Sequence, residues 1–299
     1  MQPADSIPWK PISNVPARDD HTDESAPLAS PKVHGLFHGH AIGHRLPFGA
    51  RVVQQLVSDP DSPANGIELV VVYLPSATVR QSLEIPWAES AEYSGPINIE
   101  AHYRTIAPRA IAYVNGAPGV IQPTDPEKLL PLGLFVREGH QYTNFARTGL
   151  GGVLRVTDKS AWMVPVRSYE VENFGPTDSA MQGLPLLIEQ GSIGIRSNDL
   201  EEQTDRTCFA IDTAGDVFYI GVFSRHFRTM SLYDFAAVLT QLTSPTGAKI
   251  AWALDLDGGP GSRIYIPSIG KSWGSAREYV VVDYVVALPA STGETTDER

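Results

Sequence analysis

The stretch Thr207–Phe223, TCFAIDTAGDVFYIGVF, decides the fold class of this chain. Two apolar runs of strand length, Thr207–Asp212 and Val217–Phe223, flank the short polar connection TAGD, which contains a glycine. Two such runs joined by a few turn residues are typical of a β-hairpin. We therefore expect two adjacent antiparallel strands at this point of the chain.

Further apolar runs on both sides of this hairpin predict more strands. The continuous run Ile67–Leu74, IELVVVYL, suits a strand that is covered on both faces. A second run, Ala110–Val114, ends at the turn pair Asn115-Gly116. The runs Ala251–Leu256 and Tyr279–Leu288 complete the set.

One helix is predicted directly after Ser231. This residue can cap the helix, and Asp234 stands three residues on, in the capping-box position. Apolar residues then recur at helical spacing on one face, which is typical of packing on a sheet, at Leu232, Phe235, Leu239 and Leu242. Because strands outnumber helices, the predicted class is α+β: a single domain with a mixed, mostly antiparallel β-sheet packed by a few helices.

Composition sets the limits of the folded part. Residues 1–32 are rich in Pro, Ser, Asp and Ala, which predicts a flexible N-terminal arm. Residues 33–289 are expected to form the folded domain, and residues 290–299 a flexible tail.

The net charge of −11 argues against a nucleic-acid partner, because an acidic surface repels phosphate backbones. No apolar run approaches the roughly 20 residues of a membrane span.

The stretch Ala253–Ser262, ALDLDGGPGS, carries the strongest sign of chemistry. Alternate residues of a strand face the same side, so Asp255 and Asp257 are expected to lie together. Glycines let backbone approach a ligand closely and offer N–H groups to an anion. Two alternatives remain: an acidic strand end that leads into a tight turn, and a calcium loop at Asp255–Gly258, which lacks the third acid and closing Glu of an EF-hand.

A set of short motifs recurs in a fixed order in one enzyme family. Its members here are NGAPG at Asn115–Gly119, GLPLLI at Gly183–Ile188, RTCFAI at Arg206–Ile211, FSR at Phe223–Arg225, MSLYDFA at Met230–Ala236 and DLDGGPGS at Asp255–Ser262. Over roughly residues 110–288 this order resembles the phosphodiester glycosidase family. The chain departs from the family pattern at Asp255 (Asn in the family), Pro260 (Gly) and Gly261 (Ser), and the Tyr-Phe pair of the first motif is lost.

The resemblance implies a hydrolase that cleaves a sugar 1-phosphodiester, with an N-acetylglucosamine-like sugar. The departing phosphate monoester is a weak base and needs little acid assistance, so the site needs a carboxylate on the sugar side and positive charge for the phosphate. Asp257 is the candidate to activate water or stabilise the oxocarbenium-like transition state, with Asp255 as its partner. Arg206 and Arg225 are the candidates for the phosphate, because arginine binds phosphate oxygens in bidentate fashion.

Neutral contacts to the sugar or phosphate are expected from the remaining candidate residues, which are Asn115, Gly116, Gly258, Gly259 and Ser262. No cofactor or metal is expected, with a divalent ion such as calcium left open. Two further functions stay open: a catalytically inactive glycan- or sugar-phosphate-binding protein on the same scaffold, and an oligomerising structural protein. The oligomeric state stays open as well.

Two other features have plainer interpretations. Four histidines, His34, His38, His40 and His44, lie within eleven residues, but glycines interrupt the segment, so a loop-borne cluster is favoured over a metal site. Cys208 lies in a predicted strand and is expected to be a buried, inert thiol. The N-terminal residues lack the layout of a signal peptide, whereas the resemblance implies a secreted or periplasmic protein, so the localisation stays open.

Overall fold

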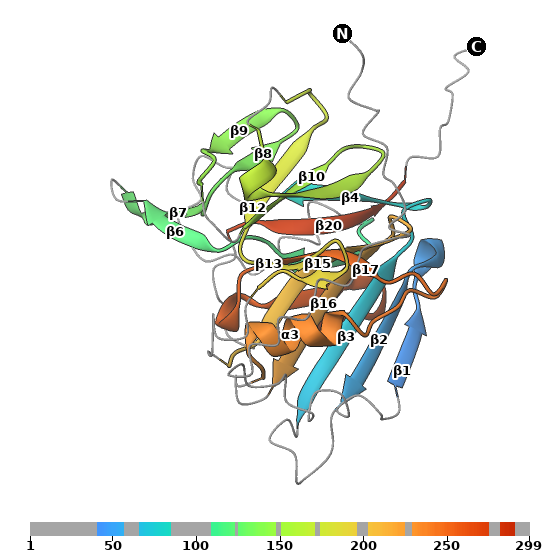
Figure 1. Cartoon of the computed structure of the whole chain (residues 1–299). Helices are drawn as coiled ribbons and strands as arrows, with labels where there is room; N and C mark the ends of the chain where they lie inside the picture. Colours follow the sequence, from blue (N-terminus) through green and yellow to red (C-terminus); the bar gives the residue numbers. More distant parts are fainter. Residues whose placement is uncertain are drawn as a thin grey trace, which may run out of the picture.

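The computed structural model describes residues 41–56, 66–84, 109–122, 125–147, 151–170, 174–195, 203–224, 229–274 and 282–290. These residues form three larger β-sheets, a two-stranded sheet and one α-helix (Figure 1). The arm predicted for residues 1–32 and the tail beyond residue 290 lie outside the described residues.

The main sheet has eight strands, with the predicted hairpin near its middle. Its order is β1 (Ala41–Arg45), β2 (Arg51–Leu56), β3 (Ile67–Leu74), β16 (Val217–Ser224), β15 (Arg206–Asp212), β17 (Ile250–Asp255), β13 (Leu186–Glu189) and β14 (Ser192–Ile193). The hairpin pairs β15 with β16 from Arg206–Val222 to Ile211–Val217. At its turn, one carboxylate oxygen of Asp212 accepts the N–H groups of Ala214 and Asp216 at 2.8 and 2.9 Å. The hairpin prediction is therefore confirmed.

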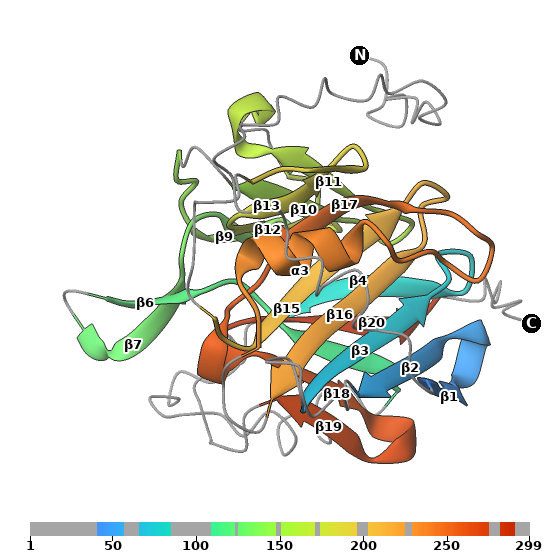
Figure 2. The same ribbon diagram turned by 60° about the horizontal axis from the view of Figure 1, so that its bottom comes forward.

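Two five-stranded sheets lie beside the main sheet (Figures 1 and 2). One has the order β11 (Ala161–Pro165), β10 (Gly152–Val156), β12 (Ser179–Gly183), β8 (Phe135–Arg137) and β9 (His140–Thr143). The other has the order β19 (Lys271–Gly274), β18 (Arg263–Ile266), β5 (Ala112–Asn115), β20 (Tyr284–Pro289) and β4 (Val79–Glu84). The two-stranded sheet, β6 (Gly119–Gln122) with β7 (Asp125–Pro131), projects from the body as an arm (Figure 2).

The helix α3 (Leu232–Leu239) begins where the sequence predicts it. The Ser231 hydroxyl oxygen accepts the N–H of Asp234 at 3.1 Å and donates to the Asp234 carboxylate at 2.8 Å. Four short 3₁₀ turns accompany it: η2 (Pro47–Gly49), η4 (Val166–Ser168), η5 (Gly259–Gly261) and η6 (Pro267–Ile269). No helix among the described residues is both long and apolar enough to cross a membrane.

The predicted α+β class is correct in its antiparallel strands and wrong in its helical share. Every pairing among the described strands is antiparallel, and α3 is the one α-helix of that part of the chain. The reason is that an apolar sheet face can be covered either by helices or by another sheet. Here other sheets cover most of it.

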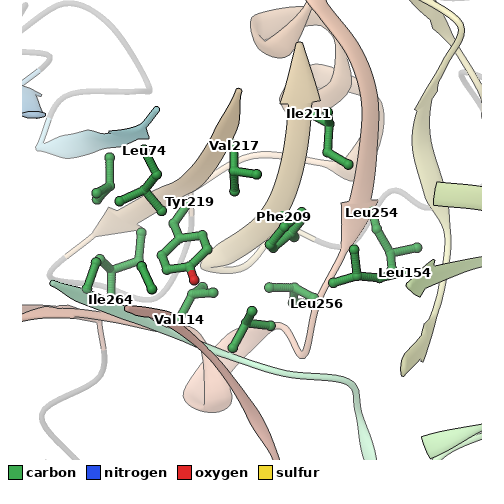
Figure 3. Packing of buried hydrophobic residues seen from close by; sticks show 14 of the residues in the cluster. Leu74, Val114, Leu154, Phe209, Ile211, Val217, Tyr219, Leu254, Leu256 and Ile264 are labelled. Atoms are coloured by element: carbon green, nitrogen blue, oxygen red, sulfur yellow. The ribbon is translucent and has the colours of Figure 1, made fainter. Parts of the chain in front are cut away.

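The main core lies between the eight-stranded sheet and the two five-stranded sheets (Figure 3). Phe209 and Tyr219 of the hairpin meet Val114 and Ile264 from one neighbouring sheet and Leu154 from the other. Full burial of each such side chain contributes about 1.5–3 kcal/mol. The sheet packing therefore fixes the strands on which the candidate site stands.

The opposite face of the main sheet is covered by α3 (Figure 2). Because side chains alternate along a strand, Cys208 and Ala210 face this side while Phe209 faces the main core. Phe235 and Leu239 of the helix pack into the same cluster. Cys208 is fully buried there, as the sequence predicted, and its burial raises the pKa of the thiol well above its usual value.

Candidate functional site

The two acids of the glycine-rich stretch lie where β17 leaves the main sheet. Asp255 pairs with Cys208 of β15, and the next residue, Leu256, donates its N–H to the Thr207 carbonyl at 3.0 Å. The Leu256 side chain points into the main core beside Phe209 (Figure 3). Strand alternation thus places the two acids away from the core and keeps Leu256 as an anchor between them.

Asn115 connects this segment to the end of β5. Its side-chain oxygen accepts the Thr207 hydroxyl at 2.7 Å and the Arg263 N–H at 2.9 Å. Its side-chain nitrogen donates to the Asp257 carbonyl at 2.8 Å. The buried Asn115 therefore holds the backbone of Asp257 in place. Its contact to sugar or phosphate stays a prediction.

The backbone of the glycine turn is held by a second set of hydrogen bonds within the protein. The Gly259 N–H donates to the Asp205 carbonyl at 2.8 Å, and the Ser262 hydroxyl lies 3.0 Å from the same oxygen. The Gly116 N–H donates to the Asp283 carbonyl at 2.8 Å. The predicted donors at Gly116, Gly259 and Ser262 are thus engaged inside the protein, and these residues shape the turn.

Within this segment Pro260 is exposed, and Asp257 and Gly258 also reach the surface. Both are partly exposed, whereas Asp255 is 3% exposed. Burial raises the pKa of Asp257 to about 6, although the backbone N–H of Gly258 lowers it in part. A carboxyl group with this pKa changes its protonation state near neutral pH, which suits acid–base chemistry.

Asp255 is a buried acid beside a positive charge. Burial raises the pKa of Asp255 well above its usual range, the Arg206 charge lowers it, and the Asp257 charge raises it. Its Oδ1 atom makes no hydrogen bond within the described residues. The three side chains therefore form one electrostatically coupled group.

Arg206 lies against the glycine turn and not in open solvent. The residue is 7% exposed, and a Cβ atom at Gly258 would lie 3.0 Å from its Nη1 atom. The absence of a side chain at Gly258 leaves room for the guanidinium group. The second arginine of the prediction, Arg225, lies outside the described residues.

Sequence reasoning missed two buried acids at this site. Asp283 precedes β20 and Asp205 precedes β15, and both are almost fully buried. Burial raises the pKa of Asp205 to about 6 and that of Asp283 well above its usual range. Asp283 interrupts the apolar run VVVDYVV, residues 280–286, and a lone acid in such a run is a signal that could have been used. No comparable pattern marks Asp205.

The described residues hold no set of three His, Cys, Asp or Glu side chains grouped to bind a metal ion. Of the histidine cluster, His44 lies exposed on β1, while His34, His38 and His40 fall in the part of the chain that the structure does not describe. The groups of this site that can carry chemistry are its carboxyl groups and Arg206.

Comparisons with known proteins match the chain to a family and its fold to solved structures. A family model described as phosphodiester glycosidase matches residues 108–289, more than half of the chain. The structure is similar to that of the zebrafish N-acetylglucosamine-1-phosphodiester alpha-N-acetylglucosaminidase catalytic domain, auto-inhibited by its pro-peptide. The two share 14% identity with a TM-score of 0.54, over 94% of this chain and 97% of that one.

Two further structures have a similar fold. A putative exported protein from Burkholderia pseudomallei matches with 13% identity and a TM-score of 0.53, over 75% of this chain and 74% of that one. A hypothetical protein from Synechocystis matches with 13% identity and a TM-score of 0.50, over 80% of this chain and 62% of that one. A search of curated proteins finds no significant match.

Proposed function

Because the chain belongs to the phosphodiester glycosidase family, we propose that it hydrolyses the bond between a sugar and a phosphodiester, with an N-acetylglucosamine-like sugar as substrate. The observation that carries this proposal is the placement of Asp257. Its carboxyl group is partly exposed, has a pKa of about 6 and stands beside the buried pair Asp255 and Arg206.

Asp257 acts in this proposal as the general base. Its ionised carboxylate takes a proton from a water molecule, and the water oxygen forms a bond to the anomeric carbon. The bond between the anomeric carbon and the phosphate oxygen breaks, and its electron pair leaves with the phosphate monoester. The leaving oxygen is a weak base, so the step does not depend on a strong general acid.

The buried side chains of Arg206 and Asp255 support this step. The positive charge of Arg206 lies next to the turn that carries Asp257, where it balances the acids and attracts the phosphate of the substrate. Asp255, when it is ionised, interacts with the Arg206 charge. The hydrogen bonds of Asn115 and Ser262 keep the backbone of Asp257 in place.

The test is the release of free sugar from a synthetic N-acetylglucosamine 1-(methyl phosphate) diester by Asp257→Asn. This substitution keeps the shape of the side chain and removes the base, so kcat should fall by about 10²–10⁴-fold. The matched control is Asp158→Asn, which removes an exposed carboxylate in the turn between β10 and β11 and should leave kcat unchanged.

The possible outcomes separate the functions. Normal turnover by a folded Asp257→Asn variant would contradict the catalytic assignment. Binding of the diester by the wild-type protein without any release of sugar would instead support an inactive sugar-phosphate-binding protein on the same scaffold.

A further inference from the structure

Asp283 is a buried carboxyl group that the proposed reaction does not yet use. The residue is 0% exposed and comes directly before β20. No described residue makes a well-aligned hydrogen bond to its carboxylate oxygens, although the Ala117 backbone N–H lies near enough to lower its pKa in part. A buried carboxylate with so little hydrogen bonding is costly, so such a group keeps its proton or serves a function.

The backbone ties Asp283 to Asp257 through Gly116. The Gly116 N–H donates to the Asp283 carbonyl at 2.8 Å, and the Gly116 carbonyl accepts the Asp257 N–H at 2.8 Å. A Cβ atom at Gly116 would lie only 1.8 Å from Oδ1 of Asp283. The carboxyl group of Asp283 thus occupies the space that a side chain at residue 116 would need.

Asp257 is the charged group that affects the pKa of Asp283. The charge of Asp257 raises the pKa of Asp283, in the same direction as burial, and the Ala117 amide opposes both. The neighbouring residues Asn115, the last of β5, and Gly116 are neutral. On the other face of β20, Tyr284 packs against Tyr113 in a separate cluster.

Two charged residues stand on β4, the strand next to β20: Arg80, opposite Leu288, and Glu84, opposite Tyr284. Glu84 of β4 pairs with Tyr284 in the sheet, and its carboxylate forms an ion pair with Arg137 at 2.9 Å. Among the described neighbours, Asp257 is therefore the acid whose charge acts on Asp283.

We propose that Asp283 is a positioning residue that holds a proton beside Asp257, so that this pair carries a single negative charge while the enzyme is active. The inference rests on the proposed function. Two close carboxyl groups resist carrying two charges, so Asp257 ionises first and Asp283 stays neutral. Once the pH is high enough for Asp283 to ionise as well, the second charge repels the phosphate of the substrate.

The experiment is the pH profile of kcat/KM for the diester in the wild type, Asp283→Asn and the control Asp158→Asn. In the wild type and the control, kcat/KM should fall about tenfold per pH unit on the alkaline side of the profile, which forms an alkaline limb. The side chain in Asp283→Asn is neutral at every pH, so kcat/KM of this variant should stay level at alkaline pH. Its profile should keep the fall at acid pH that Asp257 causes. A purely structural role of Asp283 would lower thermal stability and leave the alkaline limb in place.

A second measurement does not depend on turnover. In protein with ¹³C-labelled aspartate carboxyl groups, one resonance should show a protonated acid at pH 7 and titrate in the alkaline range, and Asp283→Asn or the smaller Asp283→Ser should remove it. The inference is overturned if the alkaline limb persists in Asp283→Asn, if the wild type has no such limb, or if Asp283 is ionised at pH 7. If the wild type releases no sugar, the proposed function fails, and the resonance still decides whether Asp283 holds the proton.

Discussion

Gly261 offers a way to move the Asp257 carboxylate without changing its chemistry. A Cβ atom at Gly261 would lie 2.2 Å from Oδ2 and 2.8 Å from Cγ of Asp257. Ordinary contacts begin near 3.4 Å, so in Gly261→Ala the carboxylate must retreat by roughly 1 Å. A misplacement of about 1 Å at a reacting group costs on the order of 100-fold in rate.

The fold should tolerate this substitution. Gly261 lies in the 3₁₀ turn η5 and does not have a positive φ angle. At such a φ angle Gly→Ala restricts the unfolded chain, which contributes about 0.4–1 kcal/mol and offsets part of the cost of displacing the carboxylate. We therefore expect kcat to fall about 100-fold while the protein stays folded and the midpoint of thermal unfolding changes little.

The assay is steady-state hydrolysis of the diester at pH 7, together with thermal unfolding followed by circular dichroism. The matched control is Gly43→Ala in β1, where the nearest atom to an added Cβ would be 3.9 Å away. A folded Gly261→Ala variant with wild-type kcat would refute the argument, since the position of the Asp257 carboxylate would then not matter.

Three further predictions concern titration and local stability. With a pKa of about 6 for Asp257, kcat/KM should fall about tenfold per pH unit below pH 6, and a rise there would make Asp257 an acid instead of a base. Asp205→Asn should raise the free energy of unfolding at pH 7.5 by up to about 3 kcal/mol in urea titrations, because burial raises the pKa of Asp205 from 3.8 to about 6. Its native carboxyl contributes stability below pH 3.8 that is lost as the pH rises through 6, so the gain should vanish near pH 4, and a gain independent of pH would contradict this origin. Ser231→Ala should cost about 1 kcal/mol of stability through the lost helix cap and leave kcat unchanged, and an unchanged urea midpoint would contradict the role of the cap.

The sequence predicted those parts of the fold that depend on local pattern. The strand Ile67–Leu74 and the hairpin around TAGD follow from strand-length apolar runs and a turn glycine, and the helix start follows from Ser231 and Asp234. The cover of the main sheet was not predictable in this way, because an apolar strand face is the same whether a helix or a sheet packs on it.

The sequence predicted which residues form the candidate site better than it predicted the contacts that they make. The order of the family motifs pointed to Asn115, Arg206 and Asp257, which the fold brings together. The hydrogen bonds of each residue depend on segments distant in the chain, so the internal use of the Gly116 and Gly259 amides had no local signal.

The anchoring of Leu256 between the two acids has a wider consequence. The spacing of Asp255 and Asp257 is set by a side chain wedged among three sheets, whereas a carboxylate on a free loop could relax independently of the body. Heating or mutation that loosens this interior should thus disable hydrolysis before the protein melts. Variation in substrate specificity would have to come from the exposed residues around Asp257, because the packed interior fixes the positions of the two acids.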